Sequence, residues 1–188
     1  MEQDRLRTAC QAIDRADFLP AGLRRAARAD QALQIGHGQT NSQPTTVRDM
    51  LRLLDPQPAD RVLDVGCGSG WTTALLGHLV GEQGRVIGVE IVPELAAWGR
   101  QNLAGYAMPW TRIEQATEGM LGRPDDGPYD RILVSAASSS LPDSLIDQLA
   151  PTGTMVVPVG GRMLRVRRTA SGTEVERHGH YAFVPLVT

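Results

Sequence analysis

The sequence VLDVGCGSG (residues 62–70), followed by WTTALLGHLV (71–80), decides the fold. The short apolar run predicts a buried strand, the alternating glycines predict a tight turn, and the next ten residues predict a helix that ends near Gly81. A strand, a glycine turn and a helix in this order form the first βα unit of a doubly wound sheet. Because glycine has no Cβ, the backbone of such a turn can also approach a ligand closely.

The same alternation continues beyond this unit. Parallel strands are predicted at 85–90, 111–116, 130–137 and 154–160, with crossover helices at 93–106 and 141–150. The end of the chain differs, because little helical sequence separates the strand-like segments 163–168, 173–177 and 181–187. We therefore predict an α/β fold with a doubly wound, mostly parallel sheet and antiparallel C-terminal edge strands.

The N-terminal region is different in character. Residues 1–28 are rich in Ala, Arg and Leu and predict short helices interrupted at Pro20. Residues 35–44 predict a loop that leads into a helix from Thr45 to Leu54. We expect one domain over 1–188, with N-terminal helices and a loop (1–55), an α/β core (56–160) and C-terminal strands (161–188).

Composition excludes several classes of protein. No stretch approaches the roughly 20 apolar residues of a membrane span, and the N-terminus MEQDRLRTAC has no apolar signal-peptide region, so we expect a cytoplasmic protein without a membrane partner. Cys10 and Cys67 have no zinc-binding or disulfide-framework spacing, and we expect no metal.

Charge narrows the chemistry further. All 19 basic residues are arginine, which excludes Schiff-base and lysine-nucleophile chemistry. The net charge of −2 argues against nucleic acid as a partner.

The glycine turn itself leaves three kinds of site open. A P-loop requires Gly-Lys-Ser/Thr, and the chain has no lysine; a dinucleotide fingerprint requires a glycine where Trp71 stands. The acidic residue within the first strand and the GxGxG spacing resemble the turn of class I methyltransferases, which approaches the amino-acid part of S-adenosylmethionine. Glu90 closes the second strand, where the doubly wound fold places an acid to accept the ribose hydroxyls.

Four further blocks resemble one methyltransferase family. IGHGQTNSQP (35–44) is similar to IGYGQTISQP of the protein-L-isoaspartate O-methyltransferase family, and AIDRADFLP (12–20), PYDRILVSAA (128–137) and FVPLV (183–187) resemble its segments in the same order. The resemblance covers roughly residues 12 to 187, whereas a generic methyltransferase would share only the cofactor half.

The resemblance implies a site. It implies S-adenosyl-L-methionine as cofactor, S-adenosyl-L-homocysteine as its product, and these cofactor-binding residues: Asp64, Gly66, Cys67, Gly68, Gly70, Glu90, Ile91, Glu118 and Gly119. Glu118 stands where the family usually has aspartate. Ser42, with Thr40 beside it, is the implied catalytic residue that orients the substrate carboxylate.

The substrate loop departs from the family pattern. Asn41 replaces a usual isoleucine, and Thr45 and Thr46 replace larger residues, so we expect a more polar pocket wall and an altered substrate preference.

The resemblance implies an enzyme that esterifies the free carboxyl of L-isoaspartyl, and also D-aspartyl, residues in damaged proteins or peptides, which starts repair through a succinimide. We expect a monomer. Two alternatives stay open. One is a carboxyl methyltransferase that acts on aspartate of a specific peptide or on another small acceptor. The other is a non-catalytic module that binds the cofactor.

Overall fold

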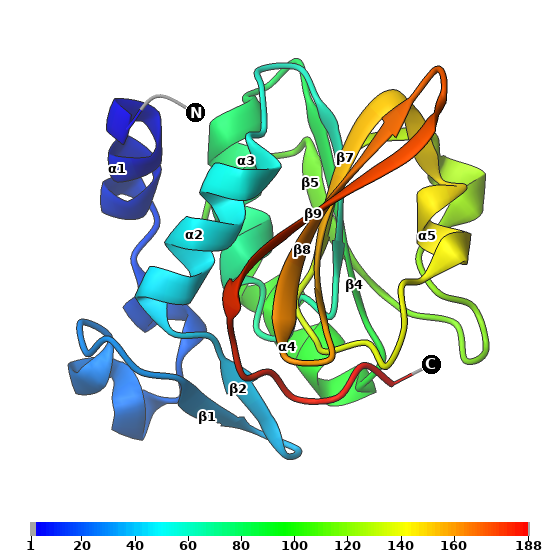
Figure 1. The fold of residues 1–188 in the computed structure, drawn as a ribbon. Coiled ribbons are helices and arrows are strands. Elements are labelled where there is room, and N and C mark those ends of the chain that lie inside the picture. Colours follow the sequence, from blue (N-terminus) through cyan, green and yellow to red (C-terminus); the bar gives the residue numbers. More distant parts are fainter. Residues whose placement is uncertain (1–2, 188) are drawn as a thin grey trace.

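The strand of the glycine-turn unit is the middle one of five parallel strands within a seven-stranded sheet in the computed structural model, which describes residues 3–187 (Figure 1). The strand order is β5-β4-β3-β6-β7-β8-β9. The strands are β3 (Arg61–Val65), β4 (Arg85–Glu90), β5 (Thr111–Gln115), β6 (Tyr129–Val134), β7 (Leu149–Val159), β8 (Arg162–Thr169) and β9 (Gly172–His180). Strands β5, β4, β3, β6 and β7 are parallel, β8 pairs antiparallel with β7, and β9 pairs antiparallel with β8. The predicted mixed sheet is therefore confirmed.

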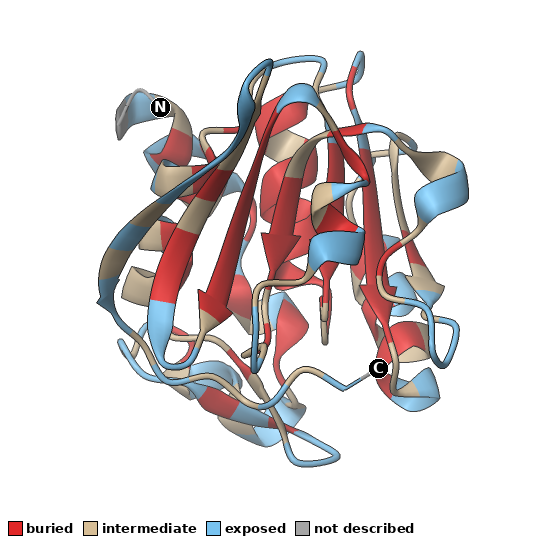
Figure 2. Ribbon diagram, turned by 45° about the vertical axis from the view of Figure 1, so that its right-hand side comes forward, coloured by how far each residue is buried: buried red, intermediate tan, exposed pale blue. Residues whose placement is uncertain are grey.

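Alternate side chains of the central strands fill two apolar layers. Val62 points into the layer covered by α1 (Gln3–Ala12), α2 (Pro44–Leu54) and α3 (Trp71–Val80), to which α4 (Pro93–Leu103) also contributes. Leu63 and Val65 point into the opposite layer, which is closed by the short α5 (Asp143–Ile146) and by loops. The centres of β3, β4, β6 and β7 are buried (Figure 2), whereas the edge strand β9 is largely exposed. A period of two in β3 thus gives both faces of the sheet a core.

Four sequence expectations need correction in detail. Residues 35–44 are not a loop, because β1 (Leu33–Gly36) and β2 (Gln39–Asn41) form an antiparallel hairpin. Its turn places Gly36, His37 and Gly38 at positive φ, a conformation that glycine adopts without steric cost. After α1, the N-terminal region forms the 3₁₀ turns η1 (Arg15–Phe18) and η2 (Ala21–Ala26) rather than a second α-helix.

The other two corrections concern the C-terminal half. The helix expected over 141–150 is only the four residues of α5, since β7 already begins at Leu149, which pairs with Tyr129. Residues 181–187 form no strand of the sheet; they make one isolated bridge, between Pro185 and Ala137. Proline has no N–H to donate to a ladder, which favours such an irregular end. We call residues 181–187 the C-terminal strap.

A short 3₁₀ turn, η3 (Pro124–Asp126), completes the described elements. Within residues 3–187, no helix is both long and apolar enough to cross a lipid bilayer.

Candidate active site

The site lies where the parallel strands end. The chain leaves β3 toward β4 and β5 and later returns to β6 on the other side of β3, so the strand order reverses at β3. In open α/β sheets, ligands bind at the carboxyl ends of the strands beside such a reversal. In Figure 2 this edge faces downward, toward the β1–β2 hairpin. The glycine turn follows β3, Glu90 ends β4, and Ser135 follows β6.

The glycine turn has the backbone that its sequence requires. Gly66, Gly68 and Gly70 have φ of 73°, 54° and 93°, in the left-handed region that side-chain-bearing residues rarely adopt. A Cβ on Gly70 would lie 2.7 Å from Ile113 Cδ1, so this glycine also allows close packing against β5. Gly70 precedes α3 without a capping side chain, which leaves the positive end of that helix facing the turn.

Glu90, the last residue of the neighbouring strand β4, stabilises the glycine turn. Its Oε2 accepts a hydrogen bond of 2.8 Å from the Gly68 N–H, and its Oε1 accepts one of 3.0 Å from the Val92 N–H. A carboxylate has about four acceptor positions, so two remain for a ligand. Glu90 is only 6% exposed, and that exposed part lines a pocket.

Asp64, in β3, stabilises the glycine turn. Its side chain is fully buried, and it accepts hydrogen bonds from the Thr72, Thr73 and Ser135 hydroxyls at 2.6, 2.7 and 3.4 Å. These donors come from the start of α3 and the end of β6, so Asp64 joins three elements of the site. Burial raises its pKa to about 6, against the lowering effect of the three hydroxyls. Asp64 lines neither pocket described below, and the structure makes it a support of the turn rather than part of the pocket wall.

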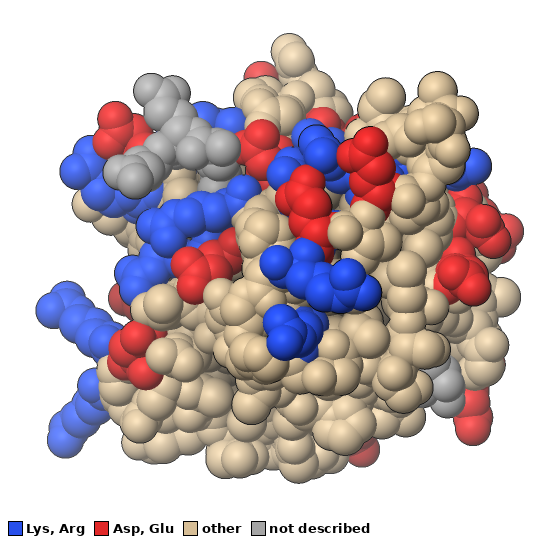
Figure 3. Space-filling model, in the orientation of Figure 1, with Lys and Arg blue, Asp and Glu red and all other residues tan. Residues whose placement is uncertain are grey.

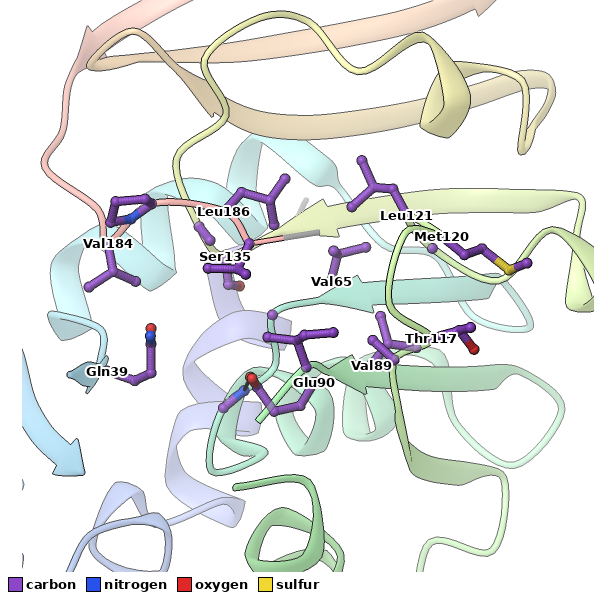
Figure 4. Close-up of a pocket in the computed structure, with 18 of the residues that line it drawn as sticks. Gln39, Val65, Val89, Glu90, Thr117, Met120, Leu121, Ser135, Val184 and Leu186 are labelled. Atoms are coloured by element: carbon purple, nitrogen blue, oxygen red, sulfur yellow. Dashed lines mark hydrogen bonds between the residues drawn. The ribbon is translucent and has the colours of Figure 1, made fainter. Parts of the chain in front are cut away.

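The larger of two adjoining pockets runs from Glu90 to the C-terminal strap (Figure 4). Its walls are mainly apolar, with Val65, Val89 and Leu121 on one side and Val184 and Leu186 of the strap on another. Gln39 and Thr40 of the hairpin close the end beside Glu90. The mixture of flat apolar walls and one carboxylate suits a ligand with an aromatic ring and a polyhydroxyl part.

A smaller pocket adjoins it and shares Thr40, Gly66, Gly68 and Ser135. Hydroxyls dominate its lining, which contains Thr40, Asn41, Ser42, Ser69, Thr72 and Ser135. No other described residue accepts or donates a hydrogen bond at the hydroxyls of Thr40 or Ser42. Trp71 also lines this pocket, and its buried Nε1–H has no partner within residues 3–187. The smaller pocket is therefore polar but carries no charged side chain.

Cys67 lines the smaller pocket but is unsuited to nucleophilic chemistry. Burial, with the carboxylates of Asp64 and Glu90 nearby, raises the pKa of its thiol well above the ordinary value. The thiol therefore stays neutral at physiological pH, and only the thiolate is a good nucleophile.

Arg15 anchors the hairpin that carries Thr40 and Ser42. Its side chain is buried and donates to five backbone carbonyls and to the Asn41 side chain, over distances of 2.7 to 3.2 Å. The carbonyls belong to Ala27, Ala29, Gln31, Asn41 and Ser42. The guanidinium also lies over the Trp71 ring, 5.4 Å from its centroid.

The structure brings most of the predicted site residues together. The larger pocket is lined by Thr40, Gly66, Gly68, Glu90 and Ile91, and the smaller one by Thr40, Ser42, Gly66, Cys67 and Gly68. Asp64 and Gly70 support the turn without lining either pocket. Glu118 is exposed and outside both linings, and Gly119 lines a wider neighbouring groove; the adenine contact proposed for this pair stays a prediction.

Several lining residues were not predicted as site residues. They include Gln39, Ser69, Trp71, Thr117, Met120, Leu121, Ser135 and the strap residues 184–187. Backbone hydrogen bonds of 2.8 Å link Ala137 to Val184 and to Leu186, and hold the strap over the pocket. In the sequence, the PYDRILVSAA and FVPLV blocks indicated that some of these segments resemble the family. They did not show that the two segments contact each other.

Comparisons with known proteins agree with this arrangement. A family model described as Protein-L-isoaspartate(D-aspartate) O-methyltransferase (PCMT) matches residues 1–188. A protein-L-isoaspartate O-methyltransferase of Methanopyrus kandleri is 43% identical over 192 residues, which cover 100% of this chain and 85% of the relative. One of Anaeromyxobacter dehalogenans is 46% identical over 181 residues, with 93% and 85% covered.

Solved structures show the same fold. One protein-L-isoaspartate O-methyltransferase superposes with a TM-score of 0.86 at 22% identity, covering 97% of this chain and 61% of its own. A Plasmodium falciparum structure, described as a putative protein of this type in complex with S-adenosyl-L-homocysteine, gives a TM-score of 0.85 at 24% identity and covers 99% and 91%.

Proposed function

Because the chain belongs to the protein-L-isoaspartate (D-aspartate) O-methyltransferase family, we propose that it methylates the free carboxyl of L-isoaspartyl residues in proteins or peptides, with S-adenosylmethionine as methyl donor. The observation that carries this proposal is the pairing, at one edge of the sheet, of a carboxylate-bearing apolar pocket with a hydroxyl-lined pocket. The first fits the donor, and the second fits a carboxylate acceptor.

The residues of the larger pocket fit the donor. Glu90 offers free acceptor positions for the ribose hydroxyls, and Val89, Ile91 and Ala116 supply an apolar slot for adenine. The glycine turn and the uncapped start of α3 suit the polar amino-acid part. The unpartnered Nε1–H of Trp71 beside the turn is a buried donor that a polar ligand group can satisfy. The bound donor supplies a methyl group activated by a positively charged sulfur.

The acceptor needs no general base. A carboxylic acid with an ordinary pKa near 4 is already ionised at neutral pH. Methylation forms an O–C bond and breaks the S–C bond, so an ester and a neutral sulfide result and no proton has to be moved. The protein must hold the carboxylate oxygen about 3 Å from the methyl carbon, in line with sulfur, and keep water away.

Ser42 and Thr40 can provide that orientation. Their hydroxyls line the smaller pocket and can donate to an anion without a strong ion pair that would weaken its nucleophilicity. Among the described residues that line the two pockets, Glu90 has the only carboxylate and none is arginine or histidine. Figure 3 shows charged side chains of both signs over the upper part of one face, whereas its lower centre is largely uncharged.

Ser42→Ala tests this assignment. We expect kcat for an isoaspartyl peptide to fall at least about ten-fold, because a loss of orientation acts on the transition state. Affinity for S-adenosylhomocysteine, measured by calorimetry, should stay within about two-fold. Ser171→Ala, at an exposed turn, is the matched control and should leave both quantities unchanged.

The substrate class is tested on the unmodified protein. Methyl-labelled donor is incubated with matched peptides that contain isoaspartate or aspartate at one position. We expect label on the isoaspartyl peptide. Transfer only to the aspartyl peptide would assign the chain to a dedicated peptide substrate, and donor binding without transfer to either peptide would support a binding module.

A further inference from the structure

We propose that Asn41 is a positioning residue that joins the hydroxyl-bearing hairpin to the glycine turn and thereby sets the place of Ser42 relative to the methyl donor. The proposal rests on the function proposed above for Ser42 and concerns a residue that departs from the family pattern. It assigns Asn41 an internal structural link in addition to its place in the polar wall of the smaller pocket, which the sequence alone suggested.

The Asn41 side chain makes two hydrogen bonds in opposite directions. Its Oδ1 accepts from Arg15 Nε at 2.7 Å, and its Nδ2 donates to Ser69 Oγ at 3.2 Å. Asn41 is 5% exposed and Ser69 is 2% exposed, so both bonds are shielded from water. A buried hydrogen bond constrains geometry strongly because breaking it leaves unsatisfied polar groups.

These bonds connect two parts of the site that the backbone does not join locally. Arg15 also donates to the backbone carbonyls of Asn41 and Ser42, at 3.1 and 2.9 Å, so it fixes the backbone of the residue that makes the link and of the next one. Ser69 lies in the glycine turn, and its carbonyl accepts from Asn102 Nδ2 of α4 at 3.0 Å. One polar chain therefore runs from η1 through the hairpin and the glycine turn to α4.

An asparagine is the side chain that this link requires. Its amide has a donor and an acceptor, one for each neighbour, whereas isoleucine offers neither and aspartate keeps only the acceptor. A further contact of the hairpin with the turn is apolar, because Ile35 packs against Gly68, where an added Cβ would lie 3.1 Å from Ile35 Cδ1. An apolar contact limits the separation of the two segments but fixes their sliding less well than directional bonds do.

The substitution at Thr45 adds no polar group to the wall of either pocket. Thr45 Oγ1 and the Thr45 N–H both donate to the Asp30 carboxylate at 2.8 Å, and Thr45 lines neither pocket. The polarity at 45 thus stabilises the start of α2, and the polarity at 41 stabilises the junction with the turn.

Asn41→Leu removes both bonds at similar volume, and Ser69→Ala removes only the bond to the turn. We expect kcat for the isoaspartyl peptide to fall about ten-fold in Asn41→Leu and about three-fold in Ser69→Ala, because small displacements of an aligned group are costly. KM for the donor should change less than about three-fold. The double variant should be no slower than Asn41→Leu alone, since the two residues act through one bond.

Gln43→Leu is the matched control. It removes an exposed bond from the same segment, from Gln43 Nε2 to Asp30 Oδ2 at 3.1 Å, and should leave kcat unchanged. A purely structural role of Asn41 would lower the melting temperature while leaving kcat below melting within two-fold in both Asn41→Leu and Ser69→Ala. That result would overturn the proposal, as would additive losses in the double variant.

Hydrogen exchange provides a readout that does not depend on turnover. Saturation with S-adenosylhomocysteine should slow amide exchange across residues 39–43 in the unmodified protein and should do so several-fold less in Ser69→Ala. Equal protection in both proteins would refute the link, even if Asn41→Leu fails to fold. If the unmodified protein methylates no isoaspartyl peptide, the proposed function fails, and the exchange comparison still decides whether Asn41 couples the two segments.

Discussion

The two halves of the site are held in place by different forces. The glycine turn is attached to β3, whose side chains Leu63 and Val65 are 0 and 3% exposed within a continuous sheet. The hairpin that carries Ser42 has only a thin apolar layer, in which Leu33 and Ile35 alternate with exposed residues, and it depends on Arg15. The proposed donor side is thus fixed by apolar packing and strand pairing, and the proposed acceptor side by buried polar bonds. Polar bonds are directional, so they suit a segment whose orientation matters more than its burial.

The largest expected effect comes from removing the Arg15 anchor. Arg15→Met keeps most of the volume but leaves five carbonyls without this donor, two in buried and three in partly buried bonds, so we expect a loss of about 3–5 kcal/mol of unfolding free energy. Urea denaturation measures it. Arg15→Lys should lose an intermediate amount, because an ammonium group cannot reproduce the planar fork. A loss below about 1 kcal/mol in Arg15→Met would contradict the contrast between the two halves.

Asp64 should make the free energy of unfolding fall as pH rises, which is unusual for a carboxyl group. Burial raises its pKa to about 6, above the ordinary value near 3.8, so the folded protein takes up this proton at higher pH than the unfolded chain does. Its contribution to stability is therefore greatest below about pH 4 and falls as pH rises to about 6. The fall amounts to about 3 kcal/mol, at about 1.36 kcal/mol for each unit of difference between the folded and unfolded pKa.

The contribution of Asp64 is measured as a difference between two proteins, because other carboxyl groups change the free energy of unfolding in the opposite direction. Hydrogen bonds from Thr45 lower the pKa of Asp30, and Arg112 lowers that of Asp126, so both groups stabilise the fold as pH rises. Unfolding free energies of the unmodified protein and of Asp64→Asn are compared between pH 4 and 7. The difference should change by about the stated amount, and a constant difference would show that Asp64 titrates normally.

The smallest of these effects concerns the donor side. Glu90→Gln keeps one acceptor oxygen but loses the charge, so affinity for S-adenosylhomocysteine should fall about 30-fold, equivalent to about 2 kcal/mol. Calorimetry measures the change, and Glu94→Gln at the exposed start of α4 is the control that should bind within two-fold. Unchanged affinity in Glu90→Gln would remove Glu90 from the donor site.

The sequence predicted the local structure of the glycine-turn half of the site well and that of the hairpin half less completely. Local patterns were enough for β3, the glycine turn and α3, because a period of two, alternate glycines and an uninterrupted helical run each specify their own backbone. The same patterns placed Glu90 at a strand end and therefore at the carboxyl edge. They could not show that Asp64 turns inward to three hydroxyls, since Ser135 is 71 residues away in sequence.

The hairpin and the strap illustrate the limit. Residues 35–44 carry turn formers that are typical of a loop, and only the pairing of β1 with β2, from Leu33 with Asn41 to Gly36 with Gln39, makes this segment a hairpin. Residues 181–187 carry a strand-like pattern, but Pro185 and the position of Ala137 leave them as a strap over the pocket.

The sequence alone determined the order of the elements, the glycine turn and the family, because these depend on residue types at short spacing. The tertiary structure decided the partners of Asn41, the burial of Arg15 and the meeting of strap and hairpin around the pocket. Side-chain hydrogen bonds between segments depend on how whole elements pack, and packing is set by the entire core. The position of Ser42 relative to the glycine turn is therefore a property of the assembled fold.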